Sequence, residues 1–212
     1  NTFDRAYSII IYFENTIYCI RDRYGVRPLA YTMSNDSIII ASELDVENTN
    51  IECGEIVKIR DYKLESIYKL DNTNLGHCLF EYIYFMNKIT IWNNINVEEV
   101  RGKYGSMLSQ LETESNIINK NDYIVVGIPN SGIPSAQIYA IKLGVKYKQL
   151  ITKNKDINRT FILNANDERK NVANQKYIFD DEIKNSRLFF LDDSIVRGIT
   201  METLVKSLKE FG

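Results

Sequence analysis

The residues best suited to chemistry lie near the end of the chain, in the segment Arg-Leu-Phe-Phe-Leu-Asp-Asp-Ser-Ile-Val-Arg-Gly-Ile-Thr at 187–200. An apolar run leads into two adjacent carboxylates, Asp192 and Asp193, and a short loop with Gly198 follows before Thr200 can begin a helix. Successive carboxylates suit a sugar diol or a divalent cation with oxygen ligands. The backbone N–H groups of the loop and the positive end of the helix suit a phosphate. The plainer alternative is a buried strand followed by a capped turn.

The elements around this segment alternate between strands and helices. Asn96 and Glu99 have the spacing of a capping box, which marks the start of a helix. Its predicted apolar face is Val97, Val100, Tyr104, Met107, Leu108 and Leu111. The predicted elements are a helix at 97–114, a strand at 123–128, a helix at 135–143 ended by Gly144, strands at 145–151 and 187–191, and a helix at 201–211. This alternation predicts a mostly parallel sheet, with ligands bound outside the carboxyl ends of its strands.

The first third of the chain has a different pattern, which predicts antiparallel strands. Two runs, 6–13 and 16–21, flank the turn signal Glu14-Asn15. Further strands are predicted at 29–33, 37–41 and 56–60. The sequence therefore predicts an α+β part followed by an α/β part, with domains at 1–72 and 73–212. The polar stretch 152–182 is too long for an ordinary connection and indicates an active-site loop or a disordered excursion.

Composition excludes several classes of function. The chain has 212 residues with 26 Lys and Arg against 28 Asp and Glu, a net charge of −2. It lacks the surplus of cations that non-specific nucleic-acid binding needs. No apolar run approaches the length of a membrane span. The three cysteines, Cys19, Cys53 and Cys78, are too few and too scattered for a disulfide framework, which is typical of a reducing compartment. From these three observations together, we expect a cytoplasmic protein that binds neither nucleic acid nor membrane.

The segment 187–200 resembles the phosphoribosylpyrophosphate (PRPP) binding motif of type I phosphoribosyltransferases. Two further stretches, Cys78–Phe85 and Lys153-Asn154 followed by 159–162, are similar to glutamine PRPP amidotransferase, the first enzyme of purine synthesis. Upstream stretches resemble the later part of the glutaminase domain of that family, although Arg21–Leu29 is also similar to asparagine synthetase. These stretches are 6–8, 21–29, 41–43 and 54–56. The resemblance is collinear and covers nearly the whole chain.

The resemblance implies both a fold and a reaction. Residues 1–72 would be the C-terminal part of an Ntn-type glutaminase sheet, and 73–212 a type I phosphoribosyltransferase domain that is incomplete at its C-terminus. The implied activity makes 5-phosphoribosylamine from PRPP and glutamine-derived ammonia, in a homo-oligomer. The family nucleophile is an N-terminal cysteine, and this chain begins with Asn1. We therefore expect a chain truncated at both ends that does not hydrolyse glutamine, with Cys19 a core residue.

Roles follow from the resemblance residue by residue. Asp192 and Asp193 match the pair that the family uses for ribose hydroxyls and Mg²⁺, and Ser131 would contribute to the metal site. Residues 129–132 match the pyrophosphate loop, 194–200 the 5′-phosphate loop, and 153–169 a flexible loop that closes over PRPP. The expected catalytic residues are Lys153 and Arg159. The expected PRPP-binding residues are Asn130, Ser131, Gly132, Asp192, Asp193, Ser194, Ile195, Val196, Arg197, Gly198 and Thr200.

Departures from the family pattern leave other functions open. Asp156 stands in the flexible loop where an aromatic residue is usual, and Ala173-Asn174 replaces a basic pair. A degenerate PRPP-binding or regulatory homologue without turnover is therefore the alternative, and a salvage phosphoribosyltransferase leaves the glutaminase-like strands unexplained. Cys78 aligns with an iron–sulfur ligand of one branch, but a cluster needs three more ligands. Its plainer interpretation is a small buried residue, and we interpret His77 as structural.

Overall fold

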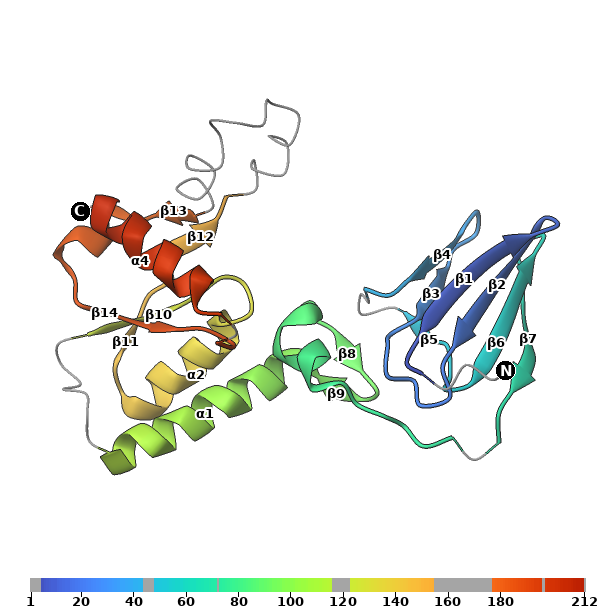
Figure 1. Cartoon of the computed structure of the whole chain (residues 1–212), viewed down its shortest axis with the longest axis horizontal. Helices are drawn as coiled ribbons and strands as arrows, with labels where there is room; N and C mark the ends of the chain where they lie inside the picture. Colours follow the sequence, from blue (N-terminus) through green and yellow to red (C-terminus); the bar gives the residue numbers. More distant parts are fainter. Residues whose placement is uncertain are drawn as a thin grey trace. The chain divides into compact units, whose positions relative to one another are not determined.

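The computed structural model of the chain describes residues 5–43, 48–71, 73–115, 123–154, 177–195 and 197–211. By packing, the chain divides into two compact units, Asn1–Val97 and Glu98–Gly212 (Figure 1). This division lies later in the chain than the domain boundary expected after residue 72. The first unit is built from antiparallel sheets, and the second contains a parallel one.

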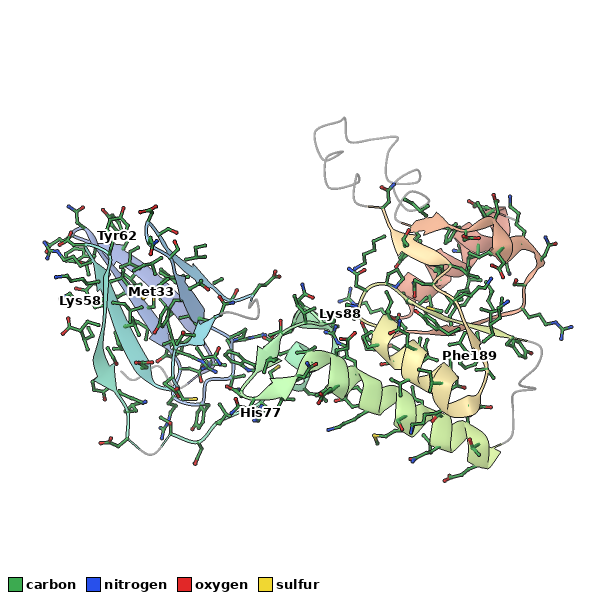
Figure 2. All side chains as sticks on the ribbon, turned by 180° about the vertical axis from the view of Figure 1, so that it is seen from behind. Met33, Lys58, Tyr62, His77, Lys88 and Phe189 are labelled. Atoms are coloured by element: carbon green, nitrogen blue, oxygen red, sulfur yellow. The ribbon has the colours of Figure 1, made fainter. Side chains whose placement is uncertain are left out.

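The main sheet of the first unit has the strand order β1-β2-β6-β7. Its strands are β1 (Ser8–Phe13), β2 (Thr16–Arg21), β6 (Glu55–Arg60) and β7 (Lys63–Lys69). Glu14 and Asn15 connect β1 to β2 with φ values of 47° and 56°, and Asp61 and Tyr62 connect β6 to β7 in the same conformation (Figure 2). Two-residue turns of positive φ match the twist of the strands that they join. The hairpin predicted around Glu14-Asn15 is confirmed.

A second sheet packs against the first and closes the core of this unit. Its order is β4-β3-β5, with strands β3 (Ala30–Met33), β4 (Ile38–Ala41) and β5 (Thr49–Asn50). Cys19, Val57 and Ile59 of the first sheet form a buried cluster with Leu29 and Ile51, which flank β3 and β5, and Tyr31 of β3 packs against it. The prediction that Cys19 is a core residue is confirmed, because its side chain is fully buried.

The segment after β7 packs on the first unit, which explains why that unit extends to Val97. It contains η1 (Glu81–Phe85), a π-helical turn, and the short strands β8 (Ile91–Trp92) and β9 (Ile95–Asn96). The Gly76 N–H donates to the Tyr24 carbonyl at 2.6 Å, and Arg27 forms a 2.6 Å ion pair with Glu81. The Arg21 guanidinium also lies 4.3 Å above the Trp92 ring. Sequence patterns did not predict these elements.

The second unit is an α/β layer structure around the parallel sheet β11-β10-β14. The strands are β10 (Ile124–Gly127), β11 (Lys146–Tyr147) and β14 (Leu188–Leu191), and the helices are α1 (Val97–Ser115), α2 (Ile133–Leu143) and α4 (Ile199–Phe211). Helix α2 begins two residues earlier than predicted, with Pro134 in its first turn. It ends at Gly144, whose φ of 68° is the expected left-handed cap. No helix in the described parts of the chain is long and apolar enough to cross a membrane.

Adjacent residues of β10 point to opposite faces of the sheet, and a helix covers each face (Figure 1). Val125 packs with α2, in a cluster with Ala136, Tyr139 and Leu143. Phe189 stacks on the Tyr139 ring at a centroid distance of 5.5 Å and strengthens this layer (Figure 2). Val126 packs on the other face, with Leu204 of α4. Burial on both faces explains the continuous apolar run of β10.

Two predictions for this unit were wrong. The strand expected at 145–151 is two strands, because β12 (Ile151–Lys153) leaves the parallel sheet and pairs with β13 (Tyr177–Phe179). The Gln149 side chain stabilises the break, since its Nε2 donates to the carbonyls of Gly127 and Ile151. The 3-10 helix η3 (Asp181–Asn185) follows β13.

The second correction concerns the buried face of α1. Met107, Leu108 and Leu111 are 60%, 43% and 61% exposed, although the sequence pattern placed them on the apolar face. Val97 is buried as the pattern predicts, but the other fully buried positions are Arg101, Gly102, Gly105 and Ser109, which the pattern did not select. Small residues occupy this face because a Cβ at position 105 would lie 2.0 Å from the Ser135 carbonyl oxygen of α2. Close approach of two backbones therefore decides which face is buried.

Candidate functional site

The two predicted carboxylates lie at the carboxyl end of β14. Leu191 ends this strand opposite Gly127, and its carbonyl accepts a 2.8 Å hydrogen bond from the Ile128 N–H. Asp192 and Asp193 follow, and both are half-buried. The Asp193 N–H donates to Asp192 Oδ1 at 2.9 Å, and the Ser194 hydroxyl donates to Asp193 Oδ1. Each carboxylate is thus oriented by its neighbour and keeps further oxygen lone pairs available for a ligand.

The loop after β10 approaches the same strand end. A Cβ on Gly132 would lie 2.7 Å from the Leu191 carbonyl oxygen and 3.2 Å from Asp192 Cα, so glycine is required for this approach. Ser131 beside it is half-buried, and Asn130 is exposed. The structure therefore brings the predicted pyrophosphate loop against the predicted ribose carboxylates, although they lie far apart in the sequence.

The loop that follows the carboxylates leads into α4. Gly198 has a φ of 72°, which favours glycine, and its carbonyl accepts the Glu202 N–H at 2.9 Å to begin the helix. The first N–H groups of a helix have no partner within it, and they carry the positive end of the helix dipole. Ile195 is 87% exposed, and Arg197 is also exposed. Val196 and the side chain of Thr200 lie outside the described residues.

The predicted closing loop is described only at its base. Lys153 is exposed at the end of β12 and is paired with Tyr177 of β13, while Arg159 lies outside the described residues. Tyr177 is buried. Burial raises the pKa of its hydroxyl, and the negative charge of Asp192 raises it further. The base of this segment therefore lies within electrostatic reach of the carboxylate pair.

Arg101 is a residue of this region that sequence patterns missed. It lies on α1 with 3% of its surface exposed. Burial lowers the pKa of its guanidinium, and the negative charge of Asp193 acts in the opposite direction. The available signal was the run of small residues after it, Gly102, Gly105 and Ser109, which marks the face of close packing.

Comparison with known proteins gives this arrangement a family. No family model matches the chain. The curated amidophosphoribosyltransferase of Methanothermobacter thermautotrophicus is 30% identical over 215 residues, and that of Pyrococcus horikoshii is 33% identical over 213 residues. Both alignments cover 98% of this chain. The solved glutamine PRPP amidotransferase of Bacillus subtilis, in complex with ADP and GMP, matches 98% of the chain with a TM-score of 0.73 and 32% identity.

The chain belongs to the amidophosphoribosyltransferase family. It spans less than half the length of the relatives it matches, 44% and 45% of the two curated proteins and 46% of the solved chain. The predicted fold class, antiparallel β-sheet followed by a parallel α/β sheet, is confirmed by this match.

The oxygen donors at the end of β14 in this chain fit a magnesium ion that is bound together with substrate. Among the residues that the structure describes, no group of three or more His, Cys, Asp or Glu side chains could hold a metal ion. Mg²⁺ is ordinarily held by one or two carboxylates, several waters and substrate phosphates rather than by an all-protein cage. Asp192 and Asp193 supply such carboxylates, and the loop that carries Ser131 lies beside them.

The cysteines of the chain do not fit an iron–sulfur cluster by themselves. A cluster takes four thiolates, and the sequence contains three cysteines. Cys19 and Cys53 are buried, and burial raises the pKa of the Cys19 thiol to about 11. Cys78 is half-buried. Cys78 is therefore not assigned as an iron–sulfur ligand.

Several family-like stretches of the first unit, 6–8, 21–29, 41–43 and 78–85, contribute to one pocket. Its volume is about 370 Å³, and its lining includes Ser8, Arg27, Ser42, Glu43 and Glu81. The Ser8 hydroxyl donates to the Pro28 carbonyl at 3.1 Å. His77, labelled in Figure 2, forms a 2.8 Å hydrogen bond with the Tyr82 hydroxyl, as expected for a structural residue.

Proposed function

We propose that this protein binds PRPP and transfers its phosphoribosyl group to ammonia. A bond forms between nitrogen and C1 of the ribose, the bond from C1 to the pyrophosphate oxygen breaks, and a proton leaves the nitrogen for solvent. The products are 5-phosphoribosylamine and pyrophosphate. The observation that supports the proposal is the contact of Gly132 with the end of β14, because residues 129–132, the proposed pyrophosphate loop, then lie beside the carboxylate pair.

The proposed roles are those that the family resemblance implies, and the positions of the described residues support them. Asp192 and Asp193 would accept hydrogen bonds from the ribose hydroxyls, and the loop 194–200 with the start of α4 would donate N–H groups to the 5′-phosphate. Residues 129–132 would face the pyrophosphate. Lys153, and Arg159 beyond it, would supply positive charge to the departing pyrophosphate. Magnesium, bound with the substrate, would neutralise part of the same developing charge.

The proposal also covers the nitrogen donor, the oligomeric state and the cellular compartment. The first unit resembles a portion of a glutaminase domain, so glutamine is the proposed source of ammonia in the complete system. The related Bacillus subtilis enzyme is named for both glutamine and PRPP, which supports this assignment by relationship. A homo-oligomer in the cytoplasm is proposed on the same ground.

A coupled assay of pyrophosphate release tests the proposed reaction. PRPP and Mg²⁺ are supplied with ammonium chloride, and pyrophosphate is measured against a reaction without ammonium. Release that rises with ammonium concentration supports the proposal. Binding of PRPP without any turnover would contradict it and would favour a degenerate PRPP-binding homologue.

A further inference from the structure

The half-buried side chain of Gln149 makes three hydrogen bonds between β11 and β12. Its Nε2 donates to the Gly127 carbonyl at 2.9 Å and to the Ile151 carbonyl at 2.6 Å. Its Oε1 accepts the Tyr147 hydroxyl at 2.5 Å. Both N–H groups and the oxygen of the amide are thus used, and a reversed amide would point its oxygen at two carbonyl oxygens. The three partners therefore hold the amide in one orientation.

One of these bonds reaches the strand that leads into the proposed pyrophosphate loop. Gly127 is the last residue of β10, and the loop 129–132 begins two residues later. The far end of the loop is fixed independently, because the Gly132 N–H donates to the Ile128 carbonyl at 3.0 Å and Gly132 lies against the Leu191 carbonyl. Without the bond from the side-chain amide, the loop would therefore still be held at the end of β14.

Another bond reaches the strand that carries Lys153. Ile151 begins β12 and is fully buried, and Lys153 ends the strand with its side chain exposed. Strand β12 pairs with β13 rather than with the parallel sheet, in a ladder that places Lys153 opposite Tyr177. The Gln149 amide therefore bonds the beginning of β12 directly to the end of β10. This bond helps to fix the distance between Lys153 and the pyrophosphate loop.

We propose that Gln149 is a positioning residue for phosphoribosyl transfer, acting through Lys153. This inference rests on the proposed function, in which Lys153 and residues 129–132 face the departing pyrophosphate. The positive charge of Lys153 stabilises that departure only where it is correctly placed, and a displacement of about 1 Å can cost a large factor in rate. The amide of Gln149 adds no charge of its own. It keeps β12, and with it Lys153, in register with the loop after β10.

The test measures the rate of ammonium-dependent pyrophosphate release and, by calorimetric titration, the affinity for Mg-PRPP. Gln149→Met keeps the length of the side chain and removes its hydrogen bonds, and Gln110→Met makes the same change at an exposed position of α1 as a matched control. Gln149→Met should lower kcat about tenfold and change affinity less than about threefold, because the contribution of Lys153 is made mainly in the transition state. Gln110→Met should change neither. A wild-type kcat in Gln149→Met would overturn the inference.

A double-mutant cycle, measured as single turnovers with enzyme in excess so that slow variants remain measurable, distinguishes this role from a merely structural one. If Gln149 acts through Lys153, Gln149→Met should change the rate less than about twofold in a Lys153→Met background. A full tenfold effect in both backgrounds would overturn the inference. Should circular dichroism show that Gln149→Met is unfolded, Tyr147→Phe, which removes the hydroxyl that orients the amide, replaces it with an expected loss of about fivefold. Absence of ammonium-dependent release in the wild-type chain would instead contradict the proposed function.

Discussion

At the scale of single residues, the chemistry proposed for the second unit depends on two carboxylates held at a strand end. The Asp193 N–H and the Ser194 hydroxyl orient them before any ligand arrives. Gly132 permits the approach of the neighbouring loop. The sequence motif predicts the carboxylates, whereas the burial of Arg101 depends on the packing of α1 against α2, which the sequence signals through the small residues Gly102, Gly105 and Ser109.

Neutralising either carboxylate should weaken PRPP binding. Asp192→Asn and Asp193→Asn each remove a charged hydrogen-bond acceptor, which contributes about 1.5–3 kcal/mol, so affinity for Mg-PRPP should fall roughly ten- to a hundredfold. Calorimetric titration measures the change. Asp181→Asn is the matched control, because Asp181 is an exposed acid paired with Lys184 in η3. Unchanged affinity in both site variants would refute the assignment.

The cysteines should differ in reactivity toward iodoacetamide at pH 8. Cys19 is fully buried with a pKa of about 11, so almost none of it is the reactive thiolate at this pH. Cys78 is half-buried and should be labelled at least about tenfold faster than Cys19. Peptide mass spectrometry measures each rate, with the unfolded chain in denaturant as the control. Equal rates in the native chain would contradict the burial of Cys19.

At the scale of elements, local sequence signals predict turns and helix ends, but they miss the features that tertiary packing decides. The hairpin at Glu14-Asn15 and the end of α2 at Gly144 follow from backbone conformations that few residues adopt, and both predictions are confirmed. Met107, Leu108 and Leu111 were wrongly placed on the buried face of α1 because close approach to α2 selects small residues over large ones. The strand at 145–151 was predicted as continuous because the hydrophobic pattern does not reveal the hydrogen bonds that the Gln149 side chain makes at the break.

Gly105→Ala should destabilise the second unit. Its Cβ would lie 2.0 Å from the Ser135 carbonyl oxygen, so α1 and α2 must move apart, at a cost of about 2 kcal/mol or more in the free energy of unfolding. Gly102→Ala is the matched control, since its Cβ would meet only the Ile138 side chain at 3.2 Å. Gain in helix propensity should keep that variant within about 1 kcal/mol of wild type. Urea unfolding measures the free energy of unfolding of both variants, and equal values would contradict the close packing of α1 on α2.

Gly132→Ala should affect both stability and binding. A Cβ there would lie 2.7 Å from the Leu191 carbonyl oxygen, so the loop must retreat from the strand end. We expect a loss of about 1–3 kcal/mol in the free energy of unfolding and a loss of Mg-PRPP affinity of about tenfold or more. Chemical unfolding and titration measure the two effects separately. Normal affinity in a folded variant would show that this loop does not contact the ligand.

At the scale of the whole molecule, the family-like stretches lie in different settings in the two units. Stretches of the first unit gather around a pocket and hold it with internal bonds such as the Arg27–Glu81 pair. Stretches of the second unit meet at one end of a parallel sheet, where such folds bind ligands. Sequence patterns predict this division of fold classes, although the segment with η1, β8 and β9 packs with the first unit.

The central claim is that PRPP binds at the carboxyl end of β14. Hydrogen–deuterium exchange, with and without Mg-PRPP, tests it most directly, because it reports on every part of the chain in one measurement. Exchange should slow in peptides covering 128–133 and 190–200, while peptides of the first unit keep their rates. Protection confined to the first unit, or no protection at 190–200 under saturating Mg-PRPP, would contradict the account.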